Sequence, residues 1–228
     1  MVNIILLGAG WHGKELYAYL KDIENLNNKI RFYGFIDDSK NISNIDGISF
    51  IGNFDDLNKH LIENKYEKFY YVAAVGNNDT RKLFVERIEA MGLDNIKPYI
   101  LIHPTAYIGK NIFIDDGSCF APHTIATTNI KIGKHCIINV KASISHNCSI
   151  GDYTSINPGV NICGDVTIGS NCVIGAGATL RDKIKIGNNV IIGAGAVAVN
   201  DIADDITAVG LPAKPVILRK KVDNVQDA

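Results

Sequence analysis

The chain has 228 residues, with 23 basic against 24 acidic side chains and a formal net charge of −1. This length allows one or two domains with buried cores. The balanced charge provides no field for a nucleic acid or a membrane, so neither partner is expected. The five cysteines are an odd number without C-x-x-C spacing, and no secretory signal precedes the first predicted strand. We therefore expect a cytoplasmic protein with reduced cysteines and no metal site.

Residues 2–98 alternate between predicted strands and predicted helices. Apolar runs predict strands at 3–7, 31–36 and 69–75. The predicted helices lie at 14–21, 54–63 and 79–91. This βαβαβα order predicts a parallel sheet that binds its ligands at the carboxyl ends of the strands.

The first predicted strand leads into a G-x-G-x-x-G sequence, Gly8-Ala9-Gly10-Trp11-His12-Gly13, and the second ends at Asp37-Asp38. Glycine lets backbone amides approach a ligand, and the start of a helix favours a phosphate. The pattern is typical of NAD sites, but a full dinucleotide fold needs two such halves and the chain has room for one before residue 99. We therefore predict a Rossmann-like half domain that binds a single nucleotide, with NAD as the alternative.

From Ile102 to about Val199 an apolar residue recurs at every sixth position. The series is Ile102, Ile108, Ile114, Phe120, Ala126, Ile132, Ile138, Ile144, Ile150, Ile156, Ile162, Ile168, Ile174, Leu180, Ile186, Ile192 and Ala198. Small or β-branched residues two positions earlier form a second inward column, which includes Cys136, Cys148 and Cys172. A six-residue period cannot keep one face of an α-helix buried. It predicts a parallel β-helix built from hexapeptide repeats.

Unbroken hexapeptides of this kind resemble the left-handed β-helix of the acyltransferase superfamily, in which three hexapeptides form one triangular coil. The glycine-rich loop, Gly34-Phe35-Ile36-Asp37-Asp38, Val75-Gly76-Asn77-Asn78 with Arg81, and Ile102-His103-Pro104 are similar to segments of nucleotide-sugar N-acetyltransferases. That family includes the bacillosamine and perosamine acetyltransferases and resembles the sialic acid O-acetyltransferases. The resemblance implies a nucleotide-sugar-binding domain at 1–98, a left-handed β-helix acyltransferase domain at 99–218 and a loose tail at 219–228.

In the resembled family the N-terminal domain binds the nucleotide of the sugar. The positions of this chain that match its binding residues are Gly10, Trp11, His12, Asp37, Asp38, Gly76 and Asp79. A second interpretation remains open for part of this set, since Asp37-Asp38 and Asn77-Asn78 are also ordinary turn residues.

The resemblance assigns the general base to His146 and the orientation of its ring to Asn147. Imidazole suits this role because it exchanges protons near neutral pH. The family commonly has an acidic residue where this chain has Asn147, and an amide supplies no charge to stabilise the imidazolium. A covalent route through Cys148 is disfavoured, because its phase in the repeat directs it into the core. His60 and His103 are expected to be structural, and His123 and His135 to lie at solvated turns.

Residues eighteen apart should stack about 4.8 Å apart if three hexapeptides form one coil. Gly164 then lies above His146, where the missing side chain would leave room for a ligand and the backbone amide could stabilise an oxyanion. Pro158, Ala176 and Ala194 form another column without bulk, as expected for a groove that holds coenzyme A, although tight corners also favour small residues. The expected acetyl-CoA site is Ser155, Gly164, Ala176 and Ala194.

Together these features predict transfer of an acetyl group from acetyl-CoA to the amine of a nucleotide-linked sugar. The substrate implied by the resemblance is a UDP-, dTDP- or GDP-linked 4-amino-4,6-dideoxy sugar of lipopolysaccharide or other glycan synthesis. Family members are homotrimers, so a homotrimer is expected. Two alternatives remain: an O-acetyltransferase of the sialic acid type, and a non-catalytic scaffold that binds nucleotide sugars.

Overall fold

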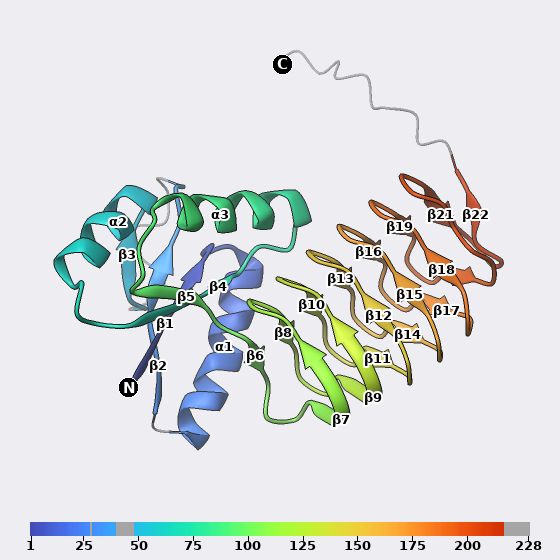
Figure 1. Ribbon diagram of the computed structural model, residues 1–228, viewed down its shortest axis with the longest axis horizontal. Coiled ribbons are helices and arrows are strands. Elements are labelled where there is room, and N and C mark those ends of the chain that lie inside the picture. Colours follow the sequence, from blue (N-terminus) through green and yellow to red (C-terminus); the bar gives the residue numbers. More distant parts are fainter. Residues whose placement is uncertain (28, 40–47, 217–228) are drawn as a thin grey trace, which may run out of the picture.

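The computed structural model describes residues 1–27, 29–39 and 48–216. Two domains lie end to end, an α/β domain followed by a parallel β-helix, as predicted (Figure 1). The tail expected at 219–228 lies outside the described residues. Among the described residues, the helices lack the combination of length and apolar character that crossing a lipid bilayer requires.

The N-terminal domain is a five-stranded parallel sheet in the order β3-β2-β1-β4-β5. Its strands are β1 (Val2–Leu7), β2 (Ile30–Ile36), β3 (Phe50–Gly52), β4 (Phe69–Ala73) and β5 (Ile96–Pro98). Its helices are α1 (Trp11–Leu26), α2 (Phe54–Glu63) and α3 (Asn78–Ala90). The three predicted strands form the centre of the sheet. The edge strands β3 and β5 were not predicted, since three residues are too few for a periodic pattern.

The central strand β1 is buried on both faces, as its continuous apolar run predicts. Ile4 and Leu6 pack on one side with α1, and Ile5 and Leu7 pack on the other side with α2 and α3. The first cluster also includes Leu101 at the start of the β-helix. The two domains therefore share part of one apolar core.

The β-helix repeats every eighteen residues, which confirms the predicted coil. Ser143 pairs with Asn161 and Ile137 pairs with Ser155, both in parallel register. One sheet contains β6 (Leu101–Ile102), β8 (Cys119–Phe120), β10 (Ile137–Ile138), β13 (Ser155–Ile156), β16 (Val173–Ile174), β19 (Ile191–Ile192), β21 (Thr207–Val209) and β22 (Lys214–Pro215). The second sheet bends around one corner and covers the two other faces.

The first of these two faces contains the strands that follow the β8 to β19 series in each coil. They are β11 (Ser143–Ile144), β14 (Asn161–Ile162), β17 (Thr179–Leu180) and β20 (Val197–Ala198). The other face contains β12 (Ser149–Ile150), β15 (Thr167–Ile168) and β18 (Lys185–Ile186). The longer strands β7 (Tyr107–Ile114) and β9 (Ile125–Ile132) run across both faces.

The predicted inward columns form the core of the β-helix. The six-residue apolar series is largely buried there, and the partly buried members of the first coil pack against it. Cys136, Cys148 and Cys172 are buried free thiols, and burial raises the pKa of each. The structure confirms the predicted core position of Cys148, and a thiolate is disfavoured at all three positions.

Arg81 on α3 joins the two domains. Its side chain is 1% exposed and donates hydrogen bonds to the backbone carbonyls of His135 and Tyr153 in the β-helix, at 2.9 and 2.8 Å. It also donates to the side-chain oxygens of Asn78 and Ser155. Burial lowers its pKa to about 10, so the guanidinium keeps its proton at neutral pH. This contact fixes the carboxyl ends of the N-terminal strands against the β-helix.

Candidate functional site

The His146 ring lies at the turn between β11 and β12. We call this turn, with the equivalent turns of the other coils, the His146 corner. The side chain is 53% exposed. The ring occupies the space directly beside Gly164 of the next coil. A Cβ atom on Gly164 would lie 2.6 Å from Nε2 of His146 and closer still to Cε1. Glycine is therefore required for the ring to lie here, because the imidazole occupies the space that a side chain on Gly164 would fill.

Asp165 faces the other nitrogen of the ring. Its Oδ2 atom lies 3.9 Å from Nδ1 of His146. Within the described residues, the Asn147 side chain hydrogen bonds to Asn129 and Asp165 rather than to the ring. The ring position of His146 therefore does not depend on a hydrogen bond from Asn147 among the described residues. Sequence reasoning missed Asp165, although the eighteen-residue spacing from Asn147 was the signal that could have found it.

The glycine-rich loop joins β1 to α1. A side chain on Gly13 would overlap the carbonyl oxygen of Gly8, so this close turn requires glycine. Asp37 braces the loop, because its two carboxylate oxygens accept hydrogen bonds from the backbone N–H groups of Ala9 and Ser39, at 2.8 and 2.9 Å. The turn-residue interpretation of Asp37 therefore describes its contacts in the structure.

The start of α1 is open to a ligand. Among the described residues, no side chain caps the helix at Gly10, and no atom lies within 4 Å of a Cβ placed on Gly10 or on Gly76. Trp11 is 87% exposed. Nδ1 of His12 forms a hydrogen bond with the Glu15 carboxylate at 3.1 Å, and this contact lowers the pKa of Glu15. Within the described residues, the buried Nε2 atom of His12 has no hydrogen-bond partner.

The other predicted nucleotide-binding carboxylates are engaged within the chain. Asp38 forms an ion pair with Arg87. Asp79, in the first turn of α3, accepts a hydrogen bond from Asn171 of the β-helix at 3.2 Å. Both side chains lie at the rim of the α/β domain that carries the loop, on its α3 side.

Ser155 is 4% exposed and belongs to the domain junction. Its hydroxyl donates to Asn78 at 2.7 Å and accepts from Arg81 at 3.1 Å. Both capacities of the hydroxyl are used there, so we assign Ser155 to the junction and leave it out of the proposed acetyl-CoA site.

The small-residue column lies at a different corner from His146. Pro158, Ala176 and Ala194 are at the turns between the β13-type and β14-type strands, and we call these turns the bare corner. Ala176 and Ala194 are exposed, and Gly177 and Gly195 beside them face open space. The face formed by β11, β14, β17 and β20 separates the bare corner from the His146 corner. One chain therefore does not bring the two predicted parts of the site together.

The structure shows the contacts of three other histidines, His60, His103 and His135. His60 and His103 are structural as predicted, bonded to Tyr33 and to Asp22 respectively. The prediction that His135 is solvated is wrong. Its ring is buried against Tyr71 and Tyr153, and burial lowers its pKa to about 4.

The structure describes His, Cys, Asp and Glu side chains in residues 1–27, 29–39 and 48–216. Among them, no three His, Cys, Asp or Glu side chains gather as a metal site requires.

Comparison with known proteins relates both domains to one group of enzymes. Residues 3–88 match the model of the PglD N-terminal domain, and residues 149–182 and 165–198 match the bacterial transferase hexapeptide model of six repeats. The acetyltransferase domain of PglB from Neisseria gonorrhoeae FA1090, solved with acetyl coenzyme A, is 31% identical with a TM-score of 0.81. The match covers 94% of this chain and 98% of that one.

Two further solved structures have the same fold. WeeI from Acinetobacter baumannii AYE is 26% identical, with a TM-score of 0.80 over 95% of this chain and 100% of that one. A mutant of perosamine N-acetyltransferase from Caulobacter crescentus, solved with CoA and GDP-perosamine, is 23% identical, with a TM-score of 0.83. That match covers 94% of this chain and 96% of that one.

Proposed function

The chain belongs to the family of hexapeptide-repeat acetyltransferases with a PglD-type N-terminal domain, and we propose that it acetylates the amine of a nucleotide-linked sugar. The acetyl donor is acetyl-CoA, the compound bound in the PglB acetyltransferase domain. The proposed acceptor is a UDP-, dTDP- or GDP-linked 4-amino-4,6-dideoxy sugar. The observation that carries the proposal is the exposed imidazole of His146, which lies in the space left by the missing side chain of Gly164.

His146 is the proposed general base. With Nδ1 directed at Asp165, Nε2 is the nitrogen left to accept a proton from the sugar amine. As the proton leaves, the amine nitrogen forms a C–N bond at the thioester carbonyl and the C–S bond breaks. The departing thiolate of coenzyme A then receives this proton from His146. The acetyl group passes directly to the amine, so no covalent enzyme intermediate is needed. Holding both substrates together supplies a large share of the rate.

The backbone amide of Gly164 is the proposed donor to the carbonyl oxygen on which negative charge develops. Within the described residues this amide donates no hydrogen bond to the protein. The amide lies directly beside the His146 ring, so the proposed hydrogen-bond donor and the proposed base are close together. A preorganised amide of this kind stabilises developing charge without reorganisation during the reaction.

The glycine-rich loop is the proposed nucleotide site. The uncapped start of α1 at Gly10 offers free backbone N–H groups, which suit the diphosphate. Trp11 presents an exposed ring beside that helix start, and the buried Nε2 of His12 has no partner within the part of the chain that the structure describes. Among the described residues no atom lies within 4 Å of a Cβ placed on Gly76, and the proposed site includes Gly76 with the carboxylates of Asp37, Asp38 and Asp79. In this proposal Asp37 acts mainly by bracing the loop.

A thiol-release assay with acetyl-CoA tests the proposed reaction. We expect turnover with at least one 4-amino-4,6-dideoxy sugar among UDP-, dTDP- and GDP-linked acceptors. The matched 4-hydroxy sugar nucleotide should give none, because a hydroxyl is a far weaker nucleophile than an amine. Acetylation of the hydroxyl compound would identify an O-acetyltransferase instead. Thermal stabilisation by a sugar nucleotide without any thiol release would identify the scaffold.

We further propose that the active site forms between copies of the chain in a homotrimer. The His146 corner and the bare corner lie on opposite sides of one face, so a neighbouring β-helix packed there could place its bare corner beside His146. Ala176 and Ala194 of that neighbour would then border the pantetheine arm of acetyl-CoA. Closed cyclic assemblies repeat such an interface three times.

Mixing two inactive variants tests this arrangement. His146→Ala removes the base, and Ala176→Trp is expected to block the bare corner with a bulky side chain. In randomly mixed trimers roughly a quarter of the interfaces combine an intact His146 with an intact Ala176, so co-expression should restore roughly a quarter of the wild-type rate. Each variant alone is the control. If the mixture stays as inactive as the single variants, each chain must carry a complete site and the shared-site proposal is wrong.

A further inference from the structure

We propose that Asp165 is the positioning residue for His146, and that it supplies from the next coil the charge that Asn147 lacks. The inference rests on the proposed function, because it assigns a second residue to the same reaction. The carboxylate faces Nδ1 at 3.9 Å, on the opposite side of the ring from the nitrogen assigned to the substrate proton. Asp165 is not a catalytic residue in this proposal, since it acts through the imidazole.

A ladder of amides fixes the carboxylate. Asn111 donates to Asn129 at 3.0 Å, Asn129 donates to Asn147 at 3.2 Å, and Asn147 donates to Oδ1 of Asp165 at 3.0 Å. All four residues have positive φ angles, between 54° and 61°, a conformation that Asn and Asp adopt more readily than other side chains. Every bond runs in the same direction along the β-helix and ends at Asp165. Its Oδ1 is therefore held, and Oδ2 is left toward the ring.

The chemistry follows from the position of the charge. A carboxylate beside Nδ1 favours the tautomer with its proton on that nitrogen, which leaves Nε2 free to accept. The same carboxylate stabilises the imidazolium that forms as the amine loses its proton. Both side chains are about half exposed, so solvent weakens the interaction and we expect an effect of about five- to tenfold on the rate.

The neighbouring corner provides a natural control. Asn171 donates to Asn189 at 3.0 Å, and Asn189 donates to Asp205 at 2.9 Å. This ladder has the same direction, the same positive φ angles and the same carboxylate end, but no histidine faces Asp205 among the described residues. A purely structural role for the ladder would make Asp165 and Asp205 equivalent.

The test compares Asp165→Asn with Asp205→Asn in the full-length protein. Asparagine keeps the shape and the acceptor for Asn147, and it tolerates the positive φ, so both variants should fold. We expect Asp165→Asn to lower kcat about five- to tenfold with an unchanged KM for the sugar nucleotide. We expect Asp205→Asn to match the wild type in both constants.

A ¹⁵N NMR spectrum of histidine-labelled protein gives a readout independent of turnover. The neutral His146 ring, identified by its loss in His146→Gln, should carry its proton on Nδ1 in the wild type and in Asp205→Asn. In Asp165→Asn the amide can present either its oxygen or its NH₂ group, so we expect a mixture of tautomers. An unchanged kcat and an unchanged tautomer in Asp165→Asn would overturn the proposal. Absence of thiol release by the wild type with every acceptor would instead overturn the proposed function, and full activity of His146→Gln would overturn the assignment of the base and with it any catalytic effect of Asp165.

Discussion

Replacing His146 with alanine is expected to lower kcat for acetyl transfer about 10³-fold, the usual contribution of a well-placed general base. The methyl group cannot accept the proton that the amine loses. The nucleotide loop lies on the other domain, so the affinity for the sugar nucleotide should not change. Steady-state kinetics by thiol release, together with calorimetric titration of the sugar nucleotide, measure the two effects separately.

His123→Asn is the matched control for this substitution. His123 is an exposed histidine at another turn of the β-helix, with a φ of 60° that asparagine tolerates. We expect this variant to retain the wild-type rate. Gly164→Ala is a second way to disturb the base, because its Cβ would displace the imidazole without removing it. A wild-type rate in both His146→Ala and Gly164→Ala would refute the assignment of the base.

Replacing Arg81 with methionine is expected to lower the free energy of unfolding by about 3–5 kcal/mol. Methionine fills much of the buried volume but donates no hydrogen bond. The carbonyl groups of His135 and Tyr153, and the Ser155 hydroxyl, would lose a donor in a region closed to water. Chemical denaturation followed by circular dichroism measures the change.

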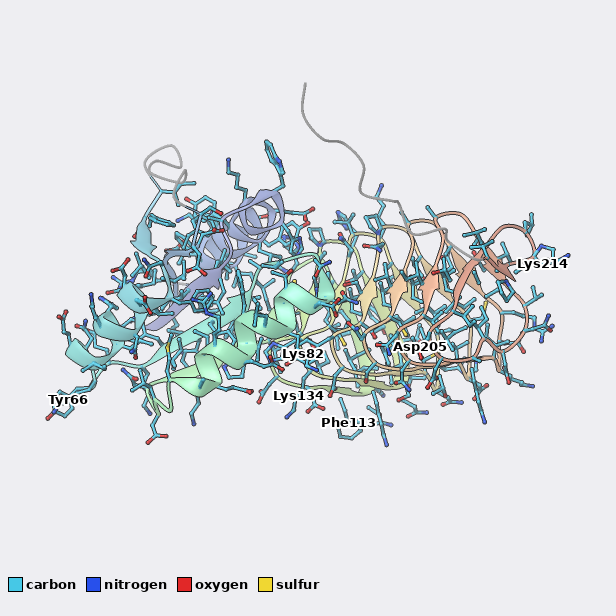
Figure 2. All side chains as sticks on the ribbon, turned by 90° about the horizontal axis from the view of Figure 1, so that it is seen from above. Tyr66, Lys82, Phe113, Lys134, Asp205 and Lys214 are labelled. Carbon is cyan, nitrogen blue, oxygen red and sulfur yellow. The ribbon has the colours of Figure 1, made fainter. Side chains whose placement is uncertain are left out.

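Lys82→Met is the control for the same change on the same helix. Lys82 follows Arg81 on α3 and is exposed near the junction of the two domains (Figure 2). Surface substitutions away from special contacts usually alter stability by less than about 0.5 kcal/mol. If Arg81→Met unfolds at the same denaturant concentration as Lys82→Met, the junction does not depend on the guanidinium.

The junction illustrates where sequence reasoning stops. Its partners are far apart along the chain: Arg81 meets His135 across 54 residues and Ser155 across 74. Periodicity assigns His135 to a turn of the repeat, and Ser155 comes directly before the inward residue Ile156. Docking of the N-terminal domain then buries these positions. The burial of His135 and Ser155 at this junction depends on long-range contacts, and no local sequence pattern contains that information.

In the β-helix and at the His146 corner, the sequence and the tertiary structure determined different features. The sequence alone determined the parallel β-helix, its eighteen-residue coil and the inward direction of Cys148, because each of these depends on a side-chain phase that repeats along the chain. Only the tertiary structure decided that the imidazole occupies the space beside Gly164 and turns Nδ1 toward Asp165. Stacking brings both residues near the ring, but side-chain torsions and competing hydrogen bonds choose the contact, and these are settled by packing between coils.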